Sequence, residues 1–171
     1  MLRLGHLREL PEQVFRQEYG AEFLSDVGLV FRHVEGCVQG EMEKPKEGHS
    51  YIAGIDLAKH NDFTVLTIAD RATRRVVHFE RFGQMDYVLQ KERLGMAITR
   101  YNRAKAWMDS TGVGDPILED LKRMGLNVEG YVFTAGSKRQ LMDGLSVSLE
   151  QERIRFPRVD QLINELKAYA L

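Results

Sequence analysis

The chain has 171 residues and a formal net charge of −1, with 24 Lys and Arg against 25 Asp and Glu. That length is typical of one domain, and the hydrophobic (43%) and charged (29%) fractions are those of a globular protein. The single cysteine excludes an intramolecular disulfide framework and any multi-cysteine metal site, and we expect a reducing, cytosolic-type compartment. No apolar run approaches the roughly 18 residues of a membrane span, and the near-neutral charge requires any nucleic-acid role to come from a local site.

The first part of the chain has a less regular pattern of apolar segments and turns than the rest. Pro11 opens a predicted helix that reaches about Gly20, and apolar residues then continue without a clear period. Residues 36–48 are rich in glycine and charge, which predicts a loop. We therefore expect residues 1–47 to form an arm, too small to be a domain, that docks on residues 48–171 or on a neighbouring module.

From residue 48 onward, short apolar runs alternate with segments of helical periodicity. Strands are predicted at residues 51–57, 63–69, 76–82, 104–108, 128–133 and 154–156. Helices are predicted at about residues 87–103, 116–124 and 137–150, and from about residue 158 to the end of the chain. The predicted helix N-caps are Asp86, Asp115 and Ser137, and Gly125 is a predicted C-terminal stop.

The order of these elements predicts a mixed sheet. Three opening strands joined by short turns form an antiparallel meander, whereas later strands that are each reached through a helix require parallel crossovers. We expect an α/β fold whose five-stranded sheet is antiparallel in strands 1–3, parallel in strands 4 and 5, and flanked by helices. This order resembles that of RNase H-like domains, in which the fourth strand pairs with the first.

Two acidic residues follow strands that this topology would bring together. Asp56 lies near the end of the first strand, and Asp109 directly follows the fourth. If these strands are parallel neighbours, both carboxylates emerge at the carboxyl edge of the sheet. Two carboxylates this close repel each other unless a proton or a divalent cation lies between them, and hard oxygen ligands favour Mg²⁺ or Mn²⁺. A two-metal site of this kind serves in-line displacement at phosphorus, although either Asp by itself is equally well explained as a turn or cap residue.

Three motifs resemble the C-terminal nuclease domain of tailed-phage terminase large subunits. They are residues 54–59 (Gly-Ile-Asp-Leu-Ala-Lys), 62–65 (Asp-Phe-Thr-Val) and 108–116 (Met-Asp-Ser-Thr-Gly-Val-Gly-Asp-Pro), and weaker similarity covers nearly the whole chain. The resemblance implies an RNase H-like endonuclease, dependent on Mg²⁺ or Mn²⁺. It would cut concatemeric double-stranded viral DNA at the initiation and termination of packaging, with Asp56 and Asp109 as catalytic metal ligands.

The same resemblance implies the partners. These are double-stranded DNA, a terminase ATPase domain in the same parent polypeptide joined through residues 1–47, the portal and the small terminase subunit. It implies the host-cell cytoplasm as the location and no membrane partner. The chain departs from the family in two ways, because it has no Gly-x-x-x-x-Gly-Lys-Ser/Thr motif and no third acid after Glu165 in the place where the family carries one. We therefore expect a domain truncated at its C-terminus, with an incomplete metal site and weak activity.

Further residues near the predicted site are candidates for secondary roles. Asp62, Ser110 and Thr111 are candidates to support the metal site or contact a phosphate, or else to shape the turns in which they lie. The DNA-binding candidates are Lys59, Lys138 and Arg139. Basic residues at the start of a helix oppose its dipole, which favours a bound anion near the last two of them. Trp107 is expected in the core.

Two other classes of protein fit parts of the pattern. An actin-like nucleotide-binding domain also starts with a three-stranded meander and an acidic first turn, but its phosphate loop normally has Gly after the Asp, where this chain has Leu57. A non-catalytic module that docks a packaging motor onto a portal is compatible with the near-neutral charge.

Overall fold

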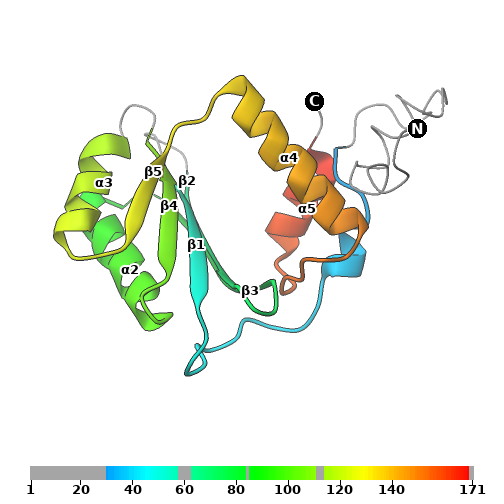
Figure 1. Cartoon of the computed structure of the whole chain (residues 1–171), viewed down its shortest axis with the longest axis horizontal. Helices are drawn as coiled ribbons and strands as arrows, with labels where there is room; N and C mark the ends of the chain where they lie inside the picture. Colours follow the sequence, from blue (N-terminus) through cyan, green and yellow to red (C-terminus); the bar gives the residue numbers. More distant parts are fainter. Residues whose placement is uncertain (1–29, 58–62, 84, 111–113, 170–171) are drawn as a thin grey trace, which may run out of the picture. The chain divides into compact units, whose positions relative to one another are not determined.

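The computed structural model describes residues 30–57, 63–83, 85–110 and 114–169, with only the backbone described for Gly114 and Asp115 (Figure 1). The chain divides into two compact units. One consists of Met1–Gly40 together with Thr134–Leu171, and the other is Glu41–Phe133. Among the described residues, no helix has the length and apolar character needed to cross a bilayer.

The unit Glu41–Phe133 is built on a five-stranded sheet (Figure 1). Its strands are β1 (Tyr51–Asp56), β2 (Phe63–Asp70), β3 (Arg75–Gly83), β4 (Lys105–Asp109) and β5 (Val128–Tyr131). Their spatial order is β3-β2-β1-β4-β5, with antiparallel pairing among β1, β2 and β3 and parallel pairing of β1 with β4 and of β4 with β5. The predicted mixed sheet, including the pairing of the fourth strand with the first, is confirmed.

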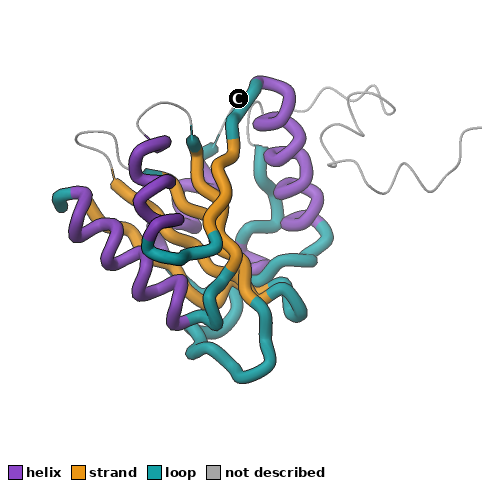
Figure 2. The backbone as a smooth tube through the Cα atoms, turned by 60° about the vertical axis from the view of Figure 1, so that its left-hand side comes forward, coloured by secondary structure: helices purple, strands orange, loops and turns teal. Residues whose placement is uncertain are grey.

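Two helices of this unit lie against one face of the sheet (Figure 2). Helix α2 (Tyr87–Arg100) begins as predicted at Asp86, whose carboxylate accepts a hydrogen bond from the Leu89 N–H at 2.9 Å. Helix α3 (Gly114–Arg123) begins one residue before Asp115, so the prediction of Asp115 as its N-cap was wrong.

The end of α3 depends on a glycine, as predicted. Gly125 has a φ of +79°, and its N–H donates to the Lys122 carbonyl at 2.8 Å. The next N–H, that of Leu126, reaches back to the Leu121 carbonyl at 3.2 Å. These two bonds form a Schellman motif, which favours glycine because other side chains are strained at this φ.

The core of the unit lies between the sheet and these two helices. Alternating residues of each strand point toward the helices, because successive side chains of a strand point to opposite faces. The largest fully buried members of this core are Leu66, Ile68, Leu94, Ile98, Met108 and Leu121. The other face of β1 and β4, which carries Asp56 and Asp109, is less buried along both strands.

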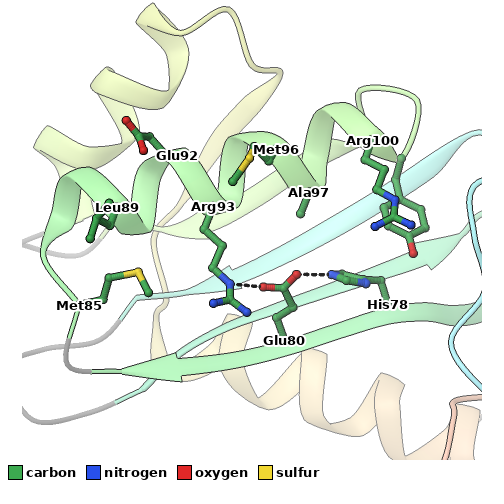
Figure 3. A pocket seen from close by; sticks show the side chains of 10 residues that line it. His78, Glu80, Met85, Leu89, Glu92, Arg93, Met96, Ala97 and Arg100 are labelled. Carbon is green, nitrogen blue, oxygen red and sulfur yellow. Dashed lines mark hydrogen bonds and ion pairs between the residues drawn. The ribbon is translucent and has the colours of Figure 1, made fainter.

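At the β3 side of the sheet, three charged or polar side chains in a row link β3 to α2 through ion pairs (Figure 3). The Glu80 carboxylate contacts the His78 ring at 2.7 Å and the Arg93 guanidinium at 2.5 Å. Burial would raise the pKa of Glu80, but the hydrogen bonds from Arg93 and His78 outweigh it, so the pKa is lowered overall. The three side chains line a surface cavity of about 580 Å³ between the strand and the helix.

The second unit contains a short 3₁₀ helix, Glu35–Cys37, and the helices α4 (Ala135–Glu150) and α5 (Asp160–Ala168). The buried Cys37 thiol donates to the Leu149 carbonyl at 3.4 Å, which ties the short helix to α4. Glu35 forms ion pairs with Arg158 and Lys167, which tie it to α5 and the residues before it. The arm predicted at residues 1–47 therefore contributes its described residues 30–40 to a unit with the C-terminal helices.

Three predictions in this unit need correction. The N-cap of α4 is Thr134 rather than Ser137, because the Thr134 hydroxyl accepts from the Ser137 N–H and the Ser137 hydroxyl in turn accepts from the Thr134 N–H. The strand predicted at residues 154–156 is a single bridge between Val38 and Phe156. The last helix ends at Ala168, since Tyr169 is already extended, instead of continuing to the end of the chain.

Candidate active site

Asp56 and Asp109 end the two central parallel strands of the sheet. The last pair in register between β1 and β4 is Ile55 with Met108, and each Asp is the next residue on its strand. Neighbouring strands lie about 4.8 Å apart, and residues at matching positions of parallel strands point to the same face. The backbone therefore places both carboxylates on one face and at one edge of the sheet, as the sequence predicted for their positions.

The two acids differ in exposure, and both lie on the face opposite the helix-covered core. Asp56 is exposed, whereas Asp109 is half-buried. The residues before them, Ile55 and Met108, are buried in the core, so the alternation of each strand turns the acids away from it. Apolar packing of the preceding residue thus fixes the direction of each carboxylate.

The residue after Asp109 continues the sheet beyond the end of β4. The Ser110 N–H donates to the Tyr131 carbonyl of β5 at 3.1 Å. Because this N–H is already used, the hydroxyl is the only hydrogen-bond donor that Ser110 could still offer to a phosphate or to a metal-site ligand. Gly130 makes the close approach possible, since a Cβ built there would lie 2.8 Å from the Ser110 Cβ and 2.8 Å from a methyl carbon of Leu118.

Other predicted site residues are less well placed by the structure. Lys59, Asp62 and Thr111 lie outside the described residues. Lys138 and Arg139 are exposed in the first turns of α4, in the other unit of the chain. The Arg139 guanidinium lies 4.0 Å from the Asp143 carboxylate one turn later, so Arg139 also forms an ion pair within α4. The DNA-binding roles of these residues stay predictions.

The donor set at the sheet edge suits a hard divalent cation. Asp56 and Asp109 supply carboxylate oxygens, which Mg²⁺ and Mn²⁺ prefer over nitrogen or sulfur. Within the described part of the chain, no group of three or more His, Cys, Asp or Glu could hold a metal ion. Neither Asp62 nor the side chain of Asp115 belongs to that part, so a third ligand is not identified.

Two features of this face differ from or add to the sequence predictions. Trp107 lies on the same face as Asp109, two residues before it, and is half-buried. The Lys105 ammonium is 4.9 Å from the centre of the Trp107 ring, so the prediction of Trp107 in the core was wrong.

Tyr131 is the register partner of Asp109, and the Tyr131 ring lies 4.9 Å from that of Phe133. Neither Tyr131 nor Phe133 was predicted from the sequence as a site residue. The signal that could have found them is their spacing of two residues at the end of a predicted strand, which places two aromatic side chains on one face.

The chain belongs to the family of terminase RNase H-like domains. A family model described as the terminase RNaseH-like domain matches residues 53–170, which is most of the chain and includes both acids. The resemblance stated from the motifs is thereby confirmed.

Two viral proteins are similar over most of the chain. The terminase large subunits of Thermus virus P23-45 and of Thermus phage G20c are each 29% identical to it over 170 residues, covering 94% of this chain. The alignment covers 35% of each relative, so the chain spans about a third of the length of these curated relatives.

Solved structures agree on the fold. The large terminase nuclease from thermophilic phage G20c is 24% identical, with a TM-score of 0.77 over 84% of this chain and 82% of that one. The same nuclease with bound zinc is 25% identical, with a TM-score of 0.75 over 82% of this chain and 87% of that one. The large terminase of bacteriophage HK97 is 18% identical, with a TM-score of 0.60 over 91% of this chain and 40% of that one.

Proposed function

We propose that this chain is the metal-dependent endonuclease domain of a viral DNA-packaging terminase large subunit. The observation that carries the proposal is the placement of Asp56 and Asp109 at the matching ends of β1 and β4. The family to which the chain belongs favours a nuclease over the actin-like alternative.

Asp56 and Asp109 would hold Mg²⁺ or Mn²⁺, one from each strand. Two such cations, when bound, would activate a water and neutralise charge on the phosphate and on the leaving oxygen. The protein itself contributes by positioning the two carboxylates. The parallel register fixes the spacing of the two carboxylates, and the buried Ile55 and Met108 keep both on one face. The similar nuclease of phage G20c has been solved with bound magnesium, zinc and cobalt, which supports a divalent cation here.

The substrate of this proposal is concatemeric double-stranded DNA, cut at the initiation and termination of packaging. The partners are a packaging ATPase joined through residues 1–47, the portal and the small terminase subunit, in the host-cell cytoplasm. The similarity to terminase large subunits of two Thermus viruses supports this setting. Lys59, Lys138 and Arg139 are the proposed phosphate contacts, and Asp62, Ser110 and Thr111 are proposed to support the site.

The test is nicking of supercoiled plasmid over a range of Mn²⁺ and Mg²⁺ concentrations. We expect Asp56→Asn and Asp109→Asn each to abolish metal-dependent nicking. Glu92→Gln is the matched control, because it also removes one carboxylate, from the exposed surface of α2, and should cut like the unchanged chain. Nicking that persists in either Asp variant, or is missing in the unchanged chain at every metal concentration, would favour the non-catalytic docking module instead.

A further inference from the structure

Two aromatic rings stand beside the acidic pair. Tyr131 ends β5 and is the register partner of Asp109, so its side chain points to the same face of the sheet as the acid. The rings of Tyr131 and Phe133 pack edge to face, with centroids 4.9 Å apart and planes at 65°. Phe133 is nevertheless 42% exposed. The exposed Phe133 ring therefore packs against Tyr131, which lies one strand away from a proposed metal ligand.

Six of the ten large hydrophobic residues that are exposed in the described part of this unit lie near the end of the sheet where β1 ends. Phe63 begins β2 at the edge where β1 ends, because its strand neighbour Val65 is the register partner of Asp56. Helix α2 starts four residues after Gly83, the partner of Phe63 on β3. The large hydrophobic residues exposed in these segments are Phe63, Tyr87, Val88, Leu89, Val132 and Phe133. Phe63 and Phe133 are the aromatic residues among them that belong to β2 and to the segment after β5, on either side of the strands that carry the acids.

We propose that the Phe133 ring, supported by Tyr131, stacks on a nucleobase of the DNA strand whose phosphate lies at Asp56 and Asp109. This inference rests on the proposed function. Neighbouring strands are about 4.8 Å apart, so Tyr131 lies within one nucleotide of a phosphate held at Asp109. A nucleobase is the occupant that suits the place, since a divalent cation held by the adjacent acids would fix the phosphate to which that base belongs. Stacking on an aromatic ring tolerates every base, because each has a π-face.

The consequence concerns the class of substrate. A base can reach a ring on the protein only after it leaves its own stack in the duplex. The contact therefore requires the double-stranded substrate to be locally unwound next to the scissile phosphate. The Tyr131 hydroxyl takes no part in the contact that supports Phe133, so only its ring is required.

The experiment measures binding without cutting. The unchanged full chain is titrated in Ca²⁺, a hard cation that carboxylates also bind, against single-stranded and fully paired oligonucleotides that contain a fluorescent purine analogue; anisotropy and analogue emission are recorded, and gels check that the oligonucleotides stay uncut. We expect tighter binding of the single strand at equal salt and a change in emission that reports stacking. Phe133→Ala should weaken single-strand binding about tenfold and remove the emission change. Phe133→Trp should keep both, and Tyr131→Phe should bind like the parent.

Two controls separate stacking from other contacts. Phe133→Leu keeps an apolar side chain without a π-face, so it should lose the emission change as the Ala variant does. Met96→Ala removes an apolar side chain that is 69% exposed in the middle of α2, and it should change neither signal. Equal binding by the parent and Phe133→Ala, or full retention of the emission change by Phe133→Leu, would overturn the inference.

The outcome is separable from that of the proposed function. If the unchanged chain nicks plasmid and Phe133→Ala binds single strands normally, the stacking inference fails and the nuclease proposal stands. If Phe133 governs binding and emission as expected while no metal supports nicking, the DNA contact stands and the proposed catalysis fails.

Discussion

Ile55 of β1 is the register partner of Met108 of β4, and both side chains are buried in the core between the sheet and its two helices. A slip of one residue in this pairing would turn one of the following acids to the core face, because side chains alternate along a strand. The apolar contact therefore sets the geometry of the acidic pair. Packing in the core and the chemistry at the edge are fixed by the same two strands.

The first prediction separates the metal site from the stability of the fold. Asp56 is exposed at a strand end, and without a cation its charge repels that of Asp109, so Asp56→Asn should lower the free energy of unfolding in EDTA by no more than about 0.5 kcal/mol. A cation that binds only the folded chain stabilises it, and the variant should lose this gain. Urea unfolding at increasing Mn²⁺ measures both quantities. Glu92→Gln should keep the full response to the metal, and an equal response from Asp56→Asn would contradict the prediction.

The second prediction concerns the close approach of β4 and β5 beside the acids. In Gly130→Ala the new methyl group would lie within 3 Å of Ser110 and Leu118, so one strand end must shift. We expect a loss of about 1–3 kcal/mol in the free energy of unfolding, and weaker nicking, because Ser110 directly follows Asp109. Gly54→Ala is the matched control, since a Cβ there has nothing within 4 Å, and it should be close to neutral. Equal stability of the two variants would show that the strand ends adapt freely.

The third prediction concerns a buried hydrogen bond between β2 and α2. The Thr64 hydroxyl donates to the Gln90 side-chain oxygen at 2.6 Å, and the Gln90 amide donates to the Met85 carbonyl at 2.8 Å. Both Thr64 and Gln90 are buried. Thr64→Val keeps the shape but leaves the Gln90 oxygen without this donor, which should cost about 1–3 kcal/mol in urea unfolding. Thr64→Ser keeps the hydroxyl and should cost less, and the opposite ranking would mean that the methyl group matters more than the bond.

The fourth prediction is a pH dependence that arises at Asp70. Burial would raise the pKa of Asp70, but hydrogen bonds from His49 and from the N–H groups of Ala72 and Thr73 outweigh it, so the pKa is lowered. A carboxyl with a lowered pKa in the folded state contributes stability that is complete above its unfolded value, near pH 4, and is lost as pH falls through the folded value. Asp70→Asn should therefore be destabilised by about 1–2 kcal/mol at pH 7.

The measurement is urea unfolding of both chains from pH 7 down to about pH 3. The difference between the unchanged chain and Asp70→Asn should shrink as the pH falls below about 4, because the carboxyl of the unchanged chain then takes up a proton as well. A difference that stays constant across this range would show that the charge of Asp70 contributes nothing.

The sequence by itself determined the order of the elements, the mixed sheet and the two acids at its edge. Each depends on local pattern: apolar runs mark the strands, Asp86 and Gly125 mark helix ends, and Asp56 and Asp109 follow predicted strands directly. The motif around Asp109 also indicated the family to which the chain belongs. These signals are read within a few residues, so no tertiary information was needed.

The tertiary structure decided which side each residue faces and what lies beside it. Trp107 and Asp109 share a face through the alternation of β4, and only the packing of the helices on the other face decides that this face is not the core. Thr134 and Ser137 are both good caps by residue type, and only the path of the backbone selects Thr134. The pairing of β5 with β4 brings Tyr131 beside Asp109 from 22 positions away in the chain, because strand pairing joins residues that local sequence patterns cannot relate.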